Sequence, residues 1–302
     1  MKNITVIGSG TMGNGIAHTF AQYGYSVSLV DLDEKALTKA IQTIQKNLDR
    51  QINKNKLTAD DKIATLNNLR TFTDLKSAVS KADLVIEAAT ENELIKSNLF
   101  KDLDNLCPSN TILASNTSSI SITRLASHTN RPDKVIGMHF MNPVPMMQLV
   151  EVIKGYDTSE TVTNKILKTA AKLQKVPVVV QDYPGFIANR ILMPMINEAI
   201  YSLYEGVAGV IEIDTVMKLG MAHPMGPLQL ADFIGLDVCL AILKVLYNGF
   251  GNAKYAPCPL LVNMVAAGHL GKKTAIGFYN YQQSDSKEPV VAARFSNVGL
   301  ST

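Results

Sequence analysis

The chain has 302 residues, of which 46% are hydrophobic and 18% charged, so it is long enough for two domains with a sizeable core. The net charge of +3 is small, and no dense block of lysine and arginine favours nucleic-acid binding. The three cysteines lie far apart without a CxxC pair, which indicates neither a disulfide framework nor a zinc site and favours a reducing cytoplasm. A strand predicted at the very start leaves no room for a signal peptide, and no uncharged apolar run is long enough for a membrane span.

The first part of the chain alternates short apolar runs with segments of helical periodicity. Strands are predicted at 3–7 and 26–30, separated by a glycine-rich turn and a helix over about 11–23. A helical hairpin is predicted at about 33–67. Further elements follow: strands at 69–72, 83–87, 111–114, 134–138, 148–153 and 176–180, and helices at about 92–105 and 158–173. This alternation predicts an α/β fold with a doubly wound (Rossmann), mostly parallel sheet that helices cover on both faces.

The pattern changes at residues 182–185 (Asp-Tyr-Pro-Gly), beyond which the periodicity is almost wholly helical. Helices are predicted at about 186–205, 212–220, 228–248 and 259–268. We therefore predict a Rossmann domain over 1–183, with the hairpin as an insertion, and a second, all-helical domain over 184–282. Residues 283–302 are polar and unpatterned, which predicts a peripheral or disordered tail.

Residues 8–13 (Gly-Ser-Gly-Thr-Met-Gly) match the dinucleotide fingerprint G-x-G-x-x-G. Gly8 permits the tight turn, Gly10 lets a pyrophosphate approach the backbone, and Gly13 lets helix and strand pack closely. Asp31 ends the next predicted strand, where it can accept hydrogen bonds from ribose hydroxyls and repel a 2′-phosphate. The hexapeptide alone is a weak signal, and a glycine turn without a ligand is the alternative. Within a complete βαβ unit it predicts NAD as cofactor.

His139 and Glu151 are placed symmetrically about Pro145 in a stretch expected to fold back as an antiparallel pair. Directly opposed residues have Cβ atoms roughly 4.5–5.5 Å apart, close enough for an imidazole to bind a carboxylate. A histidine oriented in this way suits general acid/base catalysis during hydride transfer. The hypothesis depends on the register, because a slip by one residue turns one side chain to the other face. The four other histidines are interpreted as structural: His18, His128, His223 and His269.

Three other polar segments are candidates for the same site. Residues 115–119 (Ser-Asn-Thr-Ser-Ser) follow a strand at the end where doubly wound sheets bind ligands, although a turn or helix cap is equally compatible. Glu91 follows another strand, with Lys96 about one helical turn beyond, or the two are ordinary surface charges. Asn189 lies in an apolar helix and either caps local backbone or faces the active cleft.

Five motifs at their spacings carry a resemblance to a known family: residues 8–13, 114–119, 139–143, 184–190 and 224–227. The chain resembles the short-chain L-3-hydroxyacyl-CoA dehydrogenases, and most closely their bacterial 3-hydroxybutyryl-CoA branch, from residue 1 to about 282. The resemblance implies that His139 is the catalytic base and Glu151 its partner, and that Ser118 and Asn189 surround the substrate. It also implies NAD contacts in the glycine turn, including Thr11 and Met12, and around the nicotinamide: Glu91, Lys96, Ser118, Asn142 and Lys273.

The resemblance further implies that coenzyme A binds the helical hairpin, with Asn47 and Lys54 at the contacting positions. Family members are usually homodimers joined through the helical domain. One departure is Ala275, where the family often has glycine. The expected activity is NAD-dependent oxidation of (S)-3-hydroxyacyl-CoA to 3-ketoacyl-CoA and its reverse, with short chains preferred.

Three alternatives stay open from the sequence. The β-hydroxyacid dehydrogenases share the opening motif but use a lysine in the helical half, which residues 184–190 lack. A hydroxyacid or sugar-acid dehydrogenase of the same fold would keep the His-Glu pair without binding coenzyme A. A non-catalytic NAD-binding protein would keep only the cofactor site. The short-chain preference comes from the resemblance alone, because the residues themselves fix neither the acyl-chain length nor the physiological direction.

Overall fold

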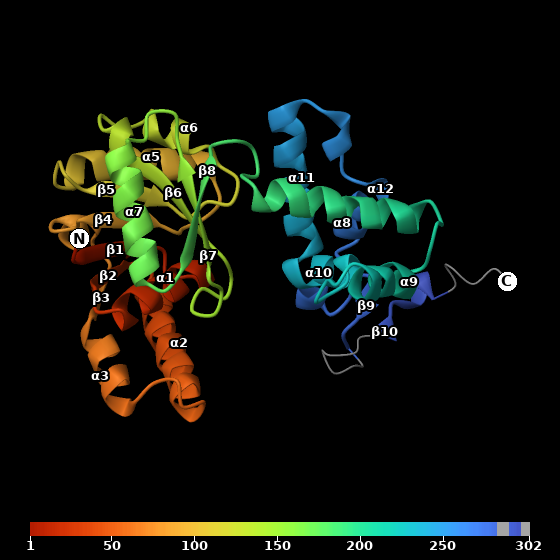
Figure 1. Cartoon of the computed structure of the whole chain (residues 1–302), viewed down its shortest axis with the longest axis horizontal. Helices are drawn as coiled ribbons and strands as arrows, with labels where there is room; N and C mark the ends of the chain where they lie inside the picture. Colours follow the sequence, from red (N-terminus) through yellow and green to blue (C-terminus); the bar gives the residue numbers. More distant parts are fainter. Residues whose placement is uncertain (283–289, 297–302) are drawn as a thin grey trace. The chain divides into compact units, whose positions relative to one another are not determined.

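The computed structural model describes residues 1–282 and 290–296, which form two compact units that divide between Tyr183 and Pro184 (Figure 1). The first unit is built on one eight-stranded sheet in the order β3-β2-β1-β4-β5-β6-β7-β8. Its strands are β1 (Asn3–Ile7), β2 (Ser26–Val30), β3 (Leu69–Phe72), β4 (Leu84–Glu87), β5 (Ile112–Ser115), β6 (Val135–Phe140), β7 (Leu149–Lys154) and β8 (Val176–Gln181). All neighbouring strands are parallel except β6 and β7. The predicted doubly wound, mostly parallel sheet is confirmed.

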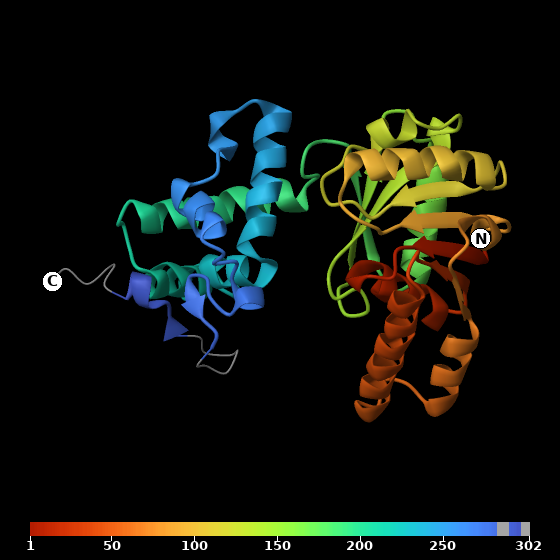
Figure 2. The same ribbon diagram turned by 180° about the vertical axis from the view of Figure 1, so that it is seen from behind.

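Helices cover both faces of this sheet. Helix α7 (Glu160–Lys172) lies in front of it in Figure 1, and α5 (Glu93–Leu106) lies on the opposite face, which Figure 2 shows from behind. Helix α1 (Thr11–Gln22) contributes Ile16, Ala17 and Phe20 to the same buried cluster as Ile166 of α7. Two short helices were not predicted, α4 (Leu75–Val79) and α6 (Ile122–Ala126), because five residues are too few to show a helical period.

The predicted hairpin is formed by α2 (Glu34–Asn53) and α3 (Ala59–Asn67), which extend away from the β2–β3 side of the sheet (Figure 1). Helix α2 buries Leu37, Ala40, Ile44 and Leu48 at the spacing of one helical face. Helix α3 begins with a capping box between Thr58 and Asp61. These local signals were all readable in the sequence, and the hairpin forms where it was expected.

The second unit is helical, with α8 (Ala188–Tyr204), α9 (Val210–Thr215), a π-helical turn (Val216–Gly220), α10 (Pro227–Ile234), α11 (Leu236–Phe250) and α12 (Pro259–Ala266). The prediction of one helix over 228–248 is wrong. The chain breaks at Gly235, whose φ of +101° lies in a region that side chains rarely adopt, so α10 ends and α11 begins there. None of the helices in the described part of the chain has the length and apolar character needed to cross a membrane.

Two buried aspartates hold the second unit together. Asp214 accepts hydrogen bonds from the Leu228 backbone (2.8 Å) and the Tyr279 hydroxyl (2.7 Å), and so caps the start of α10. Asp232 accepts from the backbone amides of Phe278 (3.0 Å) and Tyr279 (2.9 Å). Burial raises the pKa of Asp232 to about 7, although these hydrogen bonds act in the opposite direction. The aspartates lie so close to the backbone that only glycine fits beside them, at Gly226 and Gly277.

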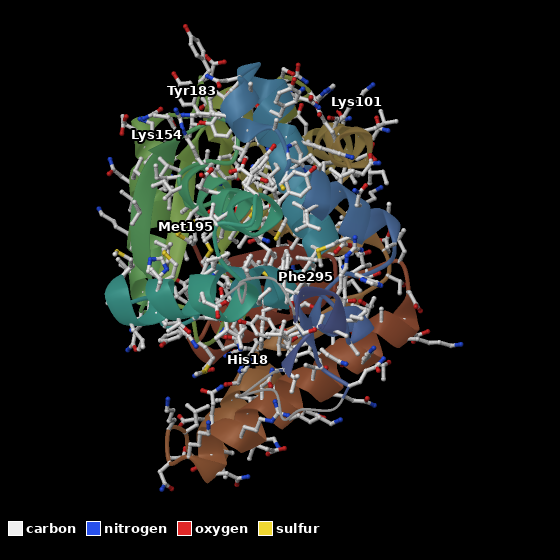
Figure 3. The ribbon with its side chains drawn as sticks, turned by 90° about the vertical axis from the view of Figure 1, so that its right-hand side faces the viewer. His18, Lys101, Lys154, Tyr183, Met195 and Phe295 are labelled. Carbon is white, nitrogen blue, oxygen red and sulfur yellow. The ribbon has the colours of Figure 1, made fainter. Side chains whose placement is uncertain are left out.

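The predicted peripheral tail is wrong for the residues that the structure describes. Val290–Val291 (β10) pairs antiparallel with Tyr279–Asn280 (β9). Phe295, labelled in Figure 3, is 6% exposed and its ring lies 5.8 Å from that of Phe278. The buried side chains of Ala292 and Phe295 are therefore enough to attach residues 290–296 to the core of the second unit. Residues 283–289 and 297–302 lie outside the described part of the chain.

The burial of His18 makes the free energy of unfolding depend on pH. His18 of α1 is fully buried, and burial lowers its pKa from 6.5 to about 4 (Figure 3). The unfolded chain therefore binds more protons than the folded chain between these values, so stability falls as the pH falls through 6.5 toward 4. We expect a loss of about 2 kcal/mol between pH 8 and pH 5 from this residue.

Urea unfolding of wild type and His18→Gln at pH 8 and pH 5 measures this loss. The variant should lose less stability on acidification than the wild type, whereas His128→Gln, at an exposed histidine, should behave as the wild type. Equal acid sensitivity of His18→Gln and wild type would contradict the assignment.

Candidate active site

The chemically active side chains of the first unit gather at one edge of the sheet. Strands β1, β2, β4, β5 and β6 run parallel, so their carboxyl ends meet at this edge, and the antiparallel β7 begins there. The glycine turn follows β1, Asp31 follows β2, and Glu87 ends β4. This is the edge where doubly wound sheets bind ligands, on either side of the switch in strand order between β1 and β4.

The predicted pairing of His139 with Glu151 is confirmed. The two residues are direct partners in the β6–β7 ladder, and His139 Nδ1 lies 2.7 Å from Glu151 Oε2. Glu151 is fully buried, while 11% of the His139 side chain is exposed. A carboxylate at Nδ1 favours the tautomer that carries its proton there, which assigns proton exchange with a substrate to Nε2. Sequence reasoning could find this pair because Pro145 marks the turn that sets the register.

Two further side chains, those of Asn116 and Lys175, hold the residues that follow His139. The Phe140 amide donates to Asn116 Oδ1 (2.9 Å), which ties β6 to the polar segment after β5. Lys175 Nζ donates to the carbonyl oxygens of Val144 (2.6 Å) and Met147 (2.8 Å). Burial lowers the pKa of Lys175. Sequence analysis missed Lys175, because a lone lysine before a strand gives no sign that it turns inward to a loop 28 to 31 residues earlier.

The glycine turn has the geometry that the fingerprint predicts. Gly8 has a φ of +94°, and a Cβ on Gly13 would lie 1.8 Å from the Gly8 carbonyl oxygen. A Cβ on Gly10 would meet nothing within 4 Å, so the backbone there is open to a ligand. No side chain in the described structure caps the start of α1, whose first amides therefore remain available to an anion such as a pyrophosphate. Thr11 is exposed at this start, while Met12 packs against the core.

Asp31 is held beside the glycine turn by Ser9. Its Oδ2 accepts hydrogen bonds from the Ser9 amide (2.7 Å) and hydroxyl (2.6 Å). Partial burial disfavours the ionised carboxyl, but the hydrogen bonds from Ser9 outweigh it and hold the pKa of Asp31 below its usual value. An ionised acceptor therefore stands at the end of β2, as recognition of an unphosphorylated ribose requires.

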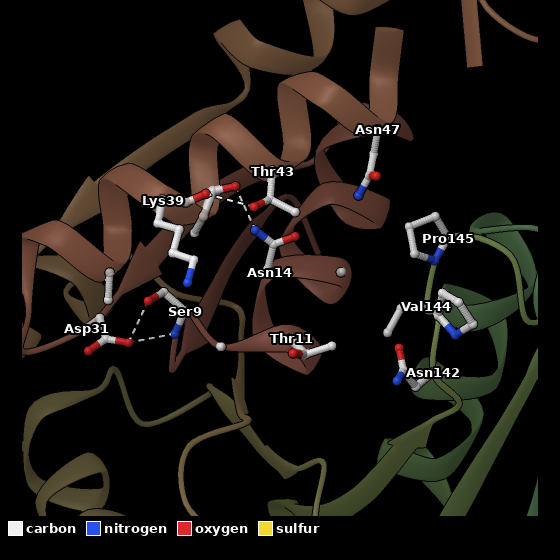
Figure 4. Close-up of a pocket in the computed structure, with 15 residues that line it drawn as sticks. Ser9, Thr11, Asn14, Asp31, Lys39, Thr43, Asn47, Asn142, Val144 and Pro145 are labelled. Atoms are coloured by element: carbon white, nitrogen blue, oxygen red, sulfur yellow. Dashed lines mark hydrogen bonds between the residues drawn. The ribbon is translucent and has the colours of Figure 1, made fainter. Parts of the chain in front are cut away.

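A cavity of about 480 Å³ opens between the glycine turn, α2 and the loop after His139 (Figure 4). Small-molecule sites have volumes of roughly 300–1,000 Å³. The lining comprises Ser9, Gly10, Thr11, Asn14, Gly15, Asp31, Ala36, Lys39, Ala40, Thr43, Asn47 and Asn142–Pro145. Lys39 and Thr43 were missed as lining residues, although they share one face of α2 with Asn47. His139 is not part of this lining, and neither is Lys54, the C-cap of α2.

Glu91 organises the polar segment after β5. Its Oε1 accepts hydrogen bonds from the Thr117 hydroxyl (2.6 Å) and the Ser118 amide (2.9 Å). Burial disfavours its charge, but Lys96 and these hydrogen bonds prevail and hold the pKa of Glu91 below its usual value. Lys96 is not a surface lysine: its side chain is 1% exposed and its Nζ lies 2.6 and 2.7 Å from the two carboxylate oxygens of Glu87.

Asn189 and Lys273 belong to the second unit. Asn189 is buried in the first turn of α8. Lys273 Nζ lies 2.6 Å from Asp237 Oδ2. Ala275, which stands where the family often has glycine, has a φ of +61°. The loop after Lys273 therefore takes the backbone conformation that glycine allows, with an alanine in place.

Comparison with known proteins agrees with this geometry. The model of the 3-hydroxyacyl-CoA dehydrogenase NAD binding domain matches residues 3–183, and the model of the C-terminal domain of that family matches residues 185–281. The chain belongs to the 3-hydroxyacyl-CoA dehydrogenase family. The fingerprint, Asp31 and the open start of α1 fit the NAD that this family uses.

Similar proteins extend over nearly the whole chain. The probable 3-hydroxybutyryl-CoA dehydrogenase of Bacillus subtilis (strain 168) is 52% identical over 286 residues, which are 95% of this chain and 99% of the relative. The human mitochondrial hydroxyacyl-coenzyme A dehydrogenase is 44% identical over 293 residues, 93% of this chain and 92% of the relative. The crystal structure of (S)-3-hydroxybutyryl-CoA dehydrogenase from Ralstonia eutropha has a TM-score of 0.91 and 49% identity, covering 94% of this chain and 100% of that one.

The environment of Asp31 predicts how the enzyme distinguishes its cofactors. Asp31→Asn removes a charged acceptor, which contributes about 1.5–3 kcal/mol to a hydrogen bond, and also removes the repulsion of a 2′-phosphate. We expect NADH affinity to fall about tenfold or more, and NADPH affinity to fall less or to rise. Fluorescence titration with both nucleotides measures this. Asp33→Asn, at the exposed N-cap of α2, is the control and should leave both affinities unchanged; an unchanged NADH-to-NADPH ratio in Asp31→Asn would refute the role.

Proposed function

We propose that this chain oxidises (S)-3-hydroxyacyl-CoA to 3-ketoacyl-CoA with NAD and catalyses the reverse reduction, with 3-hydroxybutyryl-CoA and acetoacetyl-CoA as preferred substrates. The observation that carries the proposal is the pair of His139 and a buried Glu151 at the same sheet edge as the glycine turn. The names of the bacterial relatives support the short-chain preference.

The chemistry of His139 follows from its partner. With Nδ1 bonded to Glu151, Nε2 accepts the C3 hydroxyl proton as the alcohol is oxidised. The ring then becomes an imidazolium, which the buried carboxylate stabilises, and in the reverse reaction Nε2 returns the proton to the ketone oxygen. When bound, NAD supplies the acceptor for the hydride that leaves C3. Ser118 and Asn189 take the roles that the family resemblance implies, holding the C3 oxygen and the thioester.

The coenzyme A portion binds along α2 in this proposal. Asn47 lines the cavity beside the glycine turn, and Lys54 lies two helical turns further on, at the end of the helix. The exposed ammonium group of Lys54, beyond the Asn47 amide, suits a long ligand that carries phosphates.

The cytoplasmic setting expected from the cysteines stays a prediction. All three cysteines are free buried thiols in the structure.

Replacement of the base tests the proposed reaction. General acid/base catalysis contributes about 10²- to 10⁴-fold, so His139→Gln should lower kcat for acetoacetyl-CoA reduction by that factor while NADH binding is retained. Absorbance of NADH at 340 nm follows the reaction. His128→Gln, at an exposed histidine, is the matched control.

A substrate panel separates the rival functions. Acetoacetyl-CoA should be reduced with NADH far faster than free acetoacetate, and 3-hydroxybutyryl-CoA should be oxidised with NAD far faster than a sugar acid such as gulonate. Preference for a free acid would favour the dehydrogenases that do not use coenzyme A. NADH binding without turnover of any member would favour a non-catalytic protein.

We propose that two copies of the chain associate through the helical unit. Large apolar side chains stand exposed along the end of α8 and through α9 and the π-helical turn, among them Val207 (73%), Ile211 (57%), Val216 (58%) and Leu219 (83%). Exposed apolar side chains gathered in this way are typical of an interface. A homodimer covers them and agrees with the usual assembly of the family.

Charge placed on this surface should break the dimer. Leu219→Asp is expected to convert a dimer into a monomer in size-exclusion chromatography with light scattering, because a buried unpaired carboxylate is costly. Leu94→Asp, at a leucine of the first unit that is 71% exposed, is the control and should remain dimeric. A monomeric wild type, or a dimer that Leu219→Asp leaves intact, would contradict the proposed surface.

A further inference from the structure

One buried lysine is shared by two carboxylates at the sheet edge. Lys96 Nζ lies 2.6 and 2.7 Å from the two oxygens of Glu87 and 3.5 Å from Glu91 Oε2. Glu87 is fully buried and also accepts hydrogen bonds from the Ser115 hydroxyl (2.6 Å) and the Ala89 amide (2.7 Å). Both carboxylate oxygens of Glu87 thus accept hydrogen bonds from protein groups.

The two carboxylates differ in what they do beyond the lysine. The Glu87 side chain is fully buried, whereas 41% of the Glu91 side chain is exposed. Through Oε1, Glu91 contacts the Thr117 hydroxyl, the Ser118 amide and hydroxyl, and the Ser119 hydroxyl at 3.1 Å. The contacts form a chain in which Glu87 fixes Lys96, Lys96 neutralises Glu91, and Glu91 fixes the segment that carries Ser118.

Loss of the Glu87 charge would change the contacts between Lys96 and Glu91. If Glu87 lost its charge, the buried ammonium of Lys96 would keep Glu91 as its one counter-charge among the described residues. The Glu91 carboxylate would then be drawn toward Lys96, and Glu91 would hold Ser118 less firmly. A buried charge therefore controls the geometry of groups that the family resemblance places against the cofactor.

We propose that Glu87 is a positioning residue for the nicotinamide side of the cofactor site, acting through Lys96 and Glu91. The inference rests on the proposed function and on the family resemblance, which implies that Glu91, Lys96 and Ser118 contact the cofactor. It assigns to the last residue of β4 a role in cofactor affinity, and to Lys96 the role of a buried counter-charge.

Glu87→Gln tests the inference, because it preserves the shape of the side chain and removes its charge. We expect the Kd for NADH, measured by fluorescence titration, to rise about tenfold, with KM for NADH rising in parallel and kcat falling less than about threefold. The Tm should also fall, since one buried charge is left with a single partner.

Two further variants separate positioning from folding. Asp104→Asn removes the carboxylate of another largely buried ion pair, with Arg131 at 2.7 Å, near the opposite edge of the same sheet. It should lower the Tm but leave NADH affinity unchanged. The double variant Glu87→Gln/Lys96→Met removes both buried charges, so it should recover most of the Tm that Glu87→Gln loses.

The outcomes are distinct. An unchanged Kd for NADH in Glu87→Gln overturns the inference, and so does a double variant that recovers none of the lost Tm. A fall in NADH affinity in Asp104→Asn equal to that in Glu87→Gln does the same. If the wild type binds NADH but reduces no acetoacetyl-CoA, the proposed function fails, while the binding measurements on Glu87→Gln still decide the positioning role.

Discussion

The antiparallel register of β6 and β7 is the constraint on which the active site depends. It places His139 opposite Glu151 and buries the carboxylate completely, so the imidazole has a fixed partner at Nδ1. A shift by one residue would send one of the two side chains to the other face of the sheet. The contacts of Asn116 and Lys175 to the following residues hold the loop that closes this hairpin. The backbone pairing of β6 with β7 thus determines which nitrogen of His139 exchanges a proton with the substrate.

Buried acidic side chains are used repeatedly in this molecule to fix backbone that carries no regular structure. Glu87 and Lys96 stabilise the polar segment after β5, and Asp214 and Asp232 stabilise turns in the helical unit. In each case a carboxylate is buried only because several donors surround it. Such groups contribute through the conformation they select, and removing one partner leaves the others buried without compensation.

Much of the fold could be predicted because its signals are local. The alternation of strands and helices, the glycine fingerprint and the turn at Pro145 each depend on neighbouring residues, and each was confirmed. The errors arose where tertiary contacts decide. Gly235 lies within an apolar helical period, yet it breaks the helix, and Phe295 anchors a segment of polar composition.

The site was predictable to the same extent. The pair of His139 and Glu151 could be found from its spacing about Pro145. The buried contact of the Lys96 ammonium with the Glu87 carboxylate could not, because these residues lie nine positions apart, one on a helix and the other on a strand. Lys175 and the lining residue Lys39 were missed for the same reason: a lysine in a sequence does not show whether its ammonium group reaches water, a carbonyl oxygen or a cavity.

The central claim is that Nε2 of His139 exchanges the proton at C3 of the substrate while Glu151 holds Nδ1. A crystal structure of this chain with NAD and acetoacetyl-CoA, an oxidised pair that does not react, tests it most directly. The account predicts Nε2 at about 2.6–3.2 Å from the C3 oxygen, with the contact between Nδ1 and Glu151 retained. A C3 oxygen bound by other groups, with the imidazole turned away from it, would contradict the account.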